Sequence, residues 1–147
     1  MKNQFLLPAK FKAIGWIGFL CFLALSIATH FYGFSIPGFQ IYYPEDNGSA
    51  DYNLTDEFAF AGIIVSLLMI SLARQEHEDE LIRKIRLESW QWAAIVNYVI
   101  VLVVIFATYG LGFLFIMTYN VITTLIVFIA RFYYCLYVLN RNLVKEI

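Results

Sequence analysis

Residues 90–130 read WQWAAIVNYVIVLVVIFATYGLGFLFIMTYNVITTLIVFIA, and this stretch says most about the architecture of the 147-residue chain. It contains no Asp, Glu, Lys or Arg. A transmembrane helix needs about 20 largely apolar residues, and the stretch supplies two such runs, Trp90–Tyr109 and Leu111–Ala130. The short link around Gly110 and Gly112 forces the two helices into an antiparallel hairpin. The second helix is expected to continue to about Asn140.

Two further apolar runs, Phe11–Phe34 and Asp56–Ala73, precede this hairpin. Asn53 or Thr55 is expected to cap the second of these helices. The composition, 61% hydrophobic and 14% charged with a mean hydropathy of +0.71, also points to lipid. The sequence therefore predicts a single all-α domain, a polytopic membrane protein folded as an up-down-up-down four-helix transmembrane bundle.

Charge is distributed unevenly between these runs. The segment 35–57 contains no Lys or Arg and five acids, which are Glu45, Asp46, Asp51, Asp56 and Glu57. All ten basic residues lie in the N-terminal tail, in 74–86 or from position 131 onward. By the positive-inside rule, both termini are expected in the cytoplasm, as are the segment 74–89 and the extension 131–147, with 35–55 as an acidic external loop.

The cytoplasmic segment 74–89 contains no Gly or Pro and carries opposite charges at i,i+4 spacing. We expect a helix from about Glu78 that runs into the third span and extends roughly 15 Å below the bilayer. Its charged positions are the candidate partner-binding face: Asp79, Glu80, Arg83, Lys84, Arg86 and Glu88.

Small polar residues recur inside the spans at similar depth. Together they form a candidate intramembrane polar layer of Ser66, Asn97, Asn120, Thr123 and Thr124. Interhelical hydrogen bonds, worth about 0.6 kcal/mol each, are the favoured interpretation. The alternative is a polar pocket or permeation pathway. No acid or Lys accompanies these residues in the membrane, as a proton or ion relay would require.

Other polar residues lie near the membrane boundaries. Arg131 is expected at the inner interface in an ion pair with Glu88, with a ligand, lipid-headgroup or gating role as the alternative.

The run Glu76–Glu80 around His77 is expected to be a solvated charged turn rather than a metal site, and no metal or cofactor is expected. The run Asp46–Asp51 lacks the distal Glu of a calcium loop. His30 is expected at the outer interface, with pH sensing as the alternative.

Two stretches carry a resemblance to a known family. They are LPAKFKAIGW at 7–16 and EDELIRKIRLES at 78–89, and Asn97 and Arg131 fit the same pattern. The chain resembles a family of small four-span bacterial integral membrane proteins along essentially its whole length. The resemblance implies a bacterial inner-membrane location. It supplies no activity and no catalytic or binding residues.

Three function classes remain open from the sequence. The first is a non-enzymatic membrane adaptor or sensor with a cytoplasmic protein partner. The second is a small transporter or channel, which would have to be a homo-oligomer to form a pore. The third is a membrane enzyme acting on lipid or quinone, with Arg131, His77 and Glu80 as candidates. Standard catalytic motifs are absent, and there is no basic stripe for nucleic acid.

Overall fold

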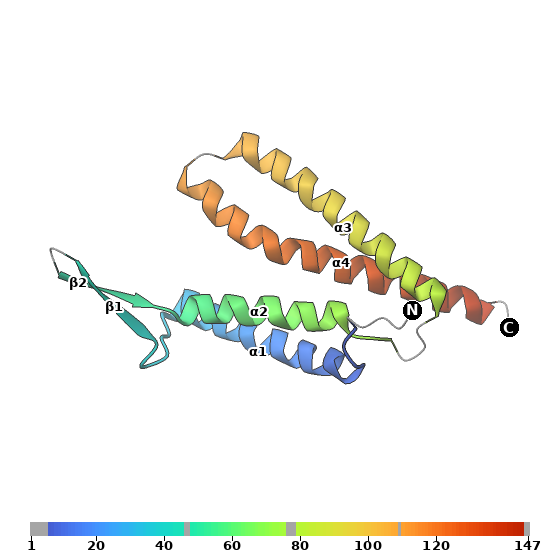
Figure 1. The fold of residues 1–147 in the computed structure, drawn as a ribbon, viewed down its shortest axis with the longest axis horizontal. Coiled ribbons are helices and arrows are strands. Elements are labelled where there is room, and N and C mark those ends of the chain that lie inside the picture. Colours follow the sequence, from blue (N-terminus) through green and yellow to red (C-terminus); the bar gives the residue numbers. More distant parts are fainter. Residues whose placement is uncertain (1–5, 46–47, 76–78, 109, 146–147) are drawn as a thin grey trace.

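A computed structural model describes residues 6–45, 48–75, 79–108 and 110–145 of the chain. Within these residues, four helices and a hairpin follow one another in the order α1 Lys10–Tyr32, β1 Gln40–Glu45, β2 Gly48–Asn53, α2 Thr55–Leu72, α3 Glu80–Ala107 and α4 Leu111–Lys145 (Figure 1). All four helices are long and apolar enough to cross a membrane, which confirms the all-helical membrane class predicted from the sequence.

The helices α1 and α2 pack side by side through small residues (Figure 1). A Cβ added to Gly15 would come within 2.8 Å of the Ile70 side chain and 3.0 Å of the Ser66 carbonyl oxygen. At Gly62, an added Cβ would overlap the ring of Phe22. Such close backbone approach is how helices associate in lipid, where the hydrophobic effect does not drive them together.

The helices α3 and α4 form a second pair, and α2 joins the two pairs by packing on α4. The buried core cluster comes from α2, α3 and α4 and consists of Ile63, Leu67, Ile70, Ala93, Leu125, Phe128, Ile129 and Phe132. Phe128 is fully buried and stacks on Trp90, with ring centroids 4.3 Å apart. Figure 1 shows the two pairs diverging toward the α3–α4 link, so the core lies near the end where α2 stops and α3 begins.

Residues 40–53, within the segment 35–55 that was predicted as an acidic external loop, form an antiparallel β-hairpin. The register runs from Gln40↔Asn53 to Glu45↔Gly48, and positions 46–47 lie outside the described residues. Aromatic and β-branched residues at 41–43 favour an extended strand, and the sequence Asp-Asn-Gly at 46–48 is typical of a tight hairpin turn. The hairpin projects beyond the helices at one end of the molecule (Figure 1).

The start of α2 also differs from the expectation. Leu54, rather than Asn53 or Thr55, occupies the N-cap position of the helix. Thr55 is instead fully buried, and the Ile36 backbone N–H donates a hydrogen bond to its Oγ1 at 3.1 Å. This hydrogen bond therefore links the segment that follows α1 to the first turn of α2.

Candidate functional site

The first turns of α3 place one charged side chain inside the protein. The buried positions of α3 are Arg86, Ser89 and Ala93, at spacings of three and four residues. Such spacing puts them on one face of the helix, the face that packs against α2 and α4. Arg86 is only 8% exposed. Arg86 was predicted to belong to the partner-binding face, but in the structure its side chain is buried.

Arg86 binds the carbonyl groups at the end of α2. Its Nη1 donates to the carbonyl oxygen of Ser71 at 2.9 Å, and both Nη1 and Nη2 donate to that of Ala73 at 3.3 Å. The last carbonyls of a helix have no partner within the helix, and they carry the negative end of its dipole. The guanidinium of Arg86 donates hydrogen bonds to these carbonyl groups and places a positive charge at the negative end of the dipole. Arg86 therefore acts as a side-chain cap for the C-terminus of α2.

Two other parts of the chain meet at the same place. The guanidinium carbon of Arg86 lies 4.7 Å from the centroid of the Phe132 ring in α4. Before α1, the Leu7 N–H donates to Leu72 O at 3.0 Å, and the Arg74 N–H donates to Leu7 O at 2.9 Å. We call Leu7, Ser71, Ala73, Arg86 and Phe132 the Arg86 cluster. It ties the N-terminal segment, α2, α3 and α4 together at one end of the molecule.

The other residues of the predicted partner-binding face are accessible. Asp79, Glu80, Arg83, Lys84 and Glu88 are all exposed. A shallow groove of about 440 Å³ runs over this part of α3, lined by Glu80, Arg83, Lys84, Arg86, Leu87 and Trp90. The exposed face thus combines charges of both signs with apolar surface, on a helix that Arg86 holds in place.

Arg131 has a different partner from the one expected. Its guanidinium carbon lies 4.6 Å from the centroid of the Trp92 ring, in the geometry of a cation–π contact. In the part of the chain that the structure describes, the Arg131–Glu88 ion pair is not formed, and Glu88 is exposed. Lys12 makes a similar contact over the Tyr133 ring at 4.6 Å. Lys12, Arg86 and Arg131 therefore each lie over an aromatic ring at this end of the bundle.

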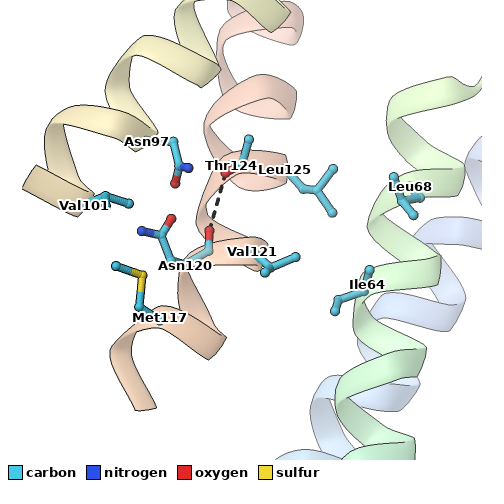
Figure 2. Close-up of a pocket in the computed structure, with 9 residues that line it drawn as sticks. All are labelled: Ile64, Leu68, Asn97, Val101, Met117, Asn120, Val121, Thr124 and Leu125. Carbon is cyan, nitrogen blue, oxygen red and sulfur yellow. Dashed lines mark hydrogen bonds between the residues drawn. The ribbon is translucent and has the colours of Figure 1, made fainter. Parts of the chain in front are cut away.

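Part of the predicted polar layer lines a cavity of about 460 Å³ between α2, α3 and α4 (Figure 2). The lining residues are Ile64, Leu68, Asn97, Val101, Met117, Asn120, Val121, Thr124 and Leu125. Asn97 comes from α3, and Asn120 and Thr124 come from α4. Figure 2 shows the amide groups of Asn97 and Asn120 turned toward each other across the gap between these helices.

The two asparagines leave amide atoms without partners. Among the described residues, no group forms a hydrogen bond with Oδ1 of Asn97 or with Oδ1 or Nδ2 of Asn120, and all three atoms are buried. Asn120 is 7% exposed. Thr124 donates its hydroxyl to the Asn120 backbone carbonyl at 3.4 Å, so it does not satisfy the Asn120 side chain. Among the described residues, no hydrogen bond therefore joins these two side chains.

Ser66 and Thr123, which the sequence analysis assigned to the same layer, do not line this cavity. Ser66 donates to the Gly62 carbonyl at 2.7 Å, and its Oγ faces Gly18 of α1. Thr123 donates to the Tyr119 carbonyl at 3.4 Å. The sequence placed all five residues at similar depth, but the direction of each side chain around its helix separates them.

A second cavity, of about 530 Å³, lies between α1, α2 and α4 near the hairpin. Its lining includes His30 at the end of α1, Asp56 and Glu57 at the start of α2, and Tyr119 of α4. None of its described lining residues also lines the cavity around Asn97. The candidate ligands Glu76 and His77 lie outside the described residues.

The capping role of Arg86 and the contacts of Leu7 and Phe132 were not predicted from the sequence. One signal was present: positions 82, 86, 89, 93 and 97 share a single helical face, and all of these residues except Arg86 are apolar or small and polar.

Comparisons of the chain with family models, with curated proteins and with solved structures gave no match.

Proposed function

We propose that this protein is a non-enzymatic membrane adaptor or sensor of the bacterial inner membrane, whose cytoplasmic face binds a protein partner. The observation that carries the proposal is the first part of α3. Its charged side chains Glu80, Arg83 and Lys84 are exposed, while Arg86 on the same turns is buried against the end of α2. A charged helix that is anchored in this way presents a preorganised surface, which lowers the entropic cost of binding.

The membrane topology in this proposal is up-down-up-down, with both termini in the cytoplasm. Support comes from contacts at the two ends of the bundle. Leu7 pairs with Ala73, and Lys12 lies over Tyr133, so the start of α1, the end of α2 and the late part of α4 meet at one end. The acids Asp56 and Glu57 lie at the opposite end with His30. The positive-inside rule assigns the basic end to the cytoplasm.

The chemistry of the groove indicates the kind of partner. The groove is lined both by charged side chains and by the apolar side chains of Leu87, which is 61% exposed, and Trp90. Interfaces of this kind bind an amphipathic helix, whose apolar side chains fill the groove and whose charges pair at the edge. The proposed partner is therefore a cytoplasmic protein with such a helix.

Copurification from native membranes in mild detergent tests the proposal. Arg83→Glu reverses one charge at the groove, and Arg141→Glu makes the same change at an exposed position late in α4. A cytoplasmic protein that copurifies with the wild type and with Arg141→Glu but is lost with Arg83→Glu would support the adaptor role. Equal recovery in all three proteins, or no copurifying protein, would contradict it.

The proposed topology has its own test. In a background with Cys21 and Cys135 replaced by Ser, a cysteine at Ser49 in the hairpin should react with a membrane-impermeant maleimide added outside intact cells. A cysteine at Arg141 should react only after the cells are opened. The reverse pattern would show that the protein is inserted the other way round.

An oligomeric cation transporter is the second candidate function. The acidic cavity beside His30 favours it, because Asp56 and Glu57 would concentrate cations at the outer surface. Cation flux into vesicles containing the purified protein, abolished by Asp56→Asn/Glu57→Gln, would support this role. Absence of flux with a monomeric protein in the membrane would exclude it.

A further inference from the structure

We infer that the cavity around Asn97 and Asn120 is a binding site for a neutral, membrane-soluble molecule whose head carries a carbonyl or hydroxyl oxygen. The inference does not depend on the proposed cytoplasmic partner. It rests on the unpartnered amides, the apolar walls and the opening of the cavity toward lipid.

The amides provide the polar part of the site. Burying an amide group without a hydrogen bond is costly, and no water is available in the hydrocarbon region to compensate. The Nδ2 of Asn120 is a donor for a carbonyl oxygen, and Oδ1 of Asn97 and of Asn120 are acceptors for a hydroxyl. Because Asn120 is more than nine-tenths buried and points into the cavity, these groups are available to a ligand there rather than to bulk water (Figure 2).

The walls of the cavity exclude charged ligands. Opposite the asparagines, Ile64 and Leu68 of α2 face Val121 and Leu125 of α4 (Figure 2). Among the residues that the structure describes, no Asp, Glu, Lys or Arg lines the cavity. Asn97 lies about 10 Å along α3 from Trp90, well inside the hydrocarbon region, where an uncompensated charge costs several kcal/mol. A neutral molecule with one or two polar atoms matches these surroundings.

Access and size agree with such a ligand. Leu68 is 37% exposed and Val121 is 52% exposed, so the cavity opens sideways between α2 and α4 toward the acyl chains. Its volume of about 460 Å³ falls within the range of small-molecule sites, about 300–1,000 Å³. It is large enough for a ring or a short chain, while a longer tail can extend into the bilayer. Membrane quinones and acylglycerols both have this chemistry.

The test uses the full-length protein in phosphatidylcholine nanodiscs and two probes. Decylubiquinone presents ring carbonyls, and dioctanoylglycerol presents a hydroxyl and ester carbonyls. Native mass spectrometry measures the probe bound per protein as the mole fraction of probe in the membrane increases. Asn120→Leu removes the amide at similar size, and Val121→Phe fills the cavity without changing the amides. Thr123→Val is the matched control, because it removes a hydroxyl on α4 outside the cavity.

We expect saturable binding of at least one probe to the wild type and to Thr123→Val. Binding should weaken about tenfold or more in Asn120→Leu and in Val121→Phe. Decylubiquinone alone would identify a quinone-type head, and dioctanoylglycerol alone an acylglycerol-type head. No saturable binding of either probe, or equal binding in all four proteins, would overturn the inference. So would a clear loss of stability in probe-free Asn120→Leu, because Asn120 would then be a structural bridge between helices.

Discussion

Replacing Arg86 with Met is expected to destabilise the protein by about 3–5 kcal/mol. The change removes three hydrogen bonds to the carbonyl oxygens of Ser71 and Ala73 and the contact over Phe132. Each carbonyl left buried without a donor costs about 1–3 kcal/mol. The lost cation–π contact adds about 0.5–2 kcal/mol. The lower cost of burying Met offsets part of this sum.

Unfolding of the purified protein by SDS in mixed micelles, followed by tryptophan fluorescence, measures the change. Arg86→Lys should fall between wild type and Arg86→Met, because an ammonium group supplies the charge without the two-pronged donor geometry of guanidinium. Arg83→Met is the matched control: Arg83 lies on the same helix but is exposed, and its loss should change the free energy of unfolding by no more than about 0.5 kcal/mol.

One result would refute this reasoning. If Arg86→Met unfolds within about 0.5 kcal/mol of wild type, as the control does, the carbonyls of Ser71 and Ala73 do not depend on Arg86. The Arg86 cluster would then not anchor α3, and the case for a preorganised cytoplasmic face would lose its structural basis.

Two further predictions concern helix packing. Gly62→Ala should cost about 1–3 kcal/mol, because the added Cβ overlaps the Phe22 ring, whereas Gly112→Ala meets no atom within 4 Å and should leave the SDS midpoint unchanged. Equal midpoints for these two variants would show that α1 and α2 are not so closely packed. A double-mutant cycle of Arg131→Gln and Trp92→Leu should give a coupling free energy of about 0.5–2 kcal/mol from their 4.6 Å contact, and additive effects would contradict it.

The helices could be predicted because one physical requirement dominates them. A segment that crosses a membrane must be long, apolar and internally hydrogen-bonded, so hydropathy alone locates it. The charged start of α3 was also predictable, since a run without Gly or Pro continues directly into the apolar span. The structure begins this helix at Glu80, two residues after the expected start at Glu78.

The site residues were harder to predict. The rise per residue gives the depth of a side chain in the membrane, but it does not say which neighbouring helix that side chain faces. Ser66 and Asn97 were placed in one layer from the rise per residue. In the structure, Ser66 lies on the face of α2 that packs on α1, whereas Asn97 lies on the face of α3 that lines the cavity. The Arg86 side chain points toward the end of α2. The position of that end relative to α3 is set by tertiary packing, and no local sequence pattern specifies it.

The hairpin was missed for a different reason. Residues 40–53 are mostly polar and aromatic, with a proline at 44, so hydrophobic periodicity does not mark them as strands. Strand pairing in such a segment depends on the turn and on the anchoring of both ends. The anchors are the Leu54 N–H bonded to Phe39 O at 3.0 Å and the buried Thr55 hydroxyl. Neither contact is readable from hydrophobic periodicity.

Site-specific photocrosslinking in living cells tests the proposed adaptor role most directly. A photoreactive amino acid would replace Leu87, which is 61% exposed in the groove of α3, or Leu102, which is 58% exposed further along the same helix. The adaptor proposal predicts a discrete adduct with one cytoplasmic protein from position 87, lost when Arg83→Glu is added, and no such adduct from position 102. The same adducts from both positions, or no protein adduct from position 87, would contradict it.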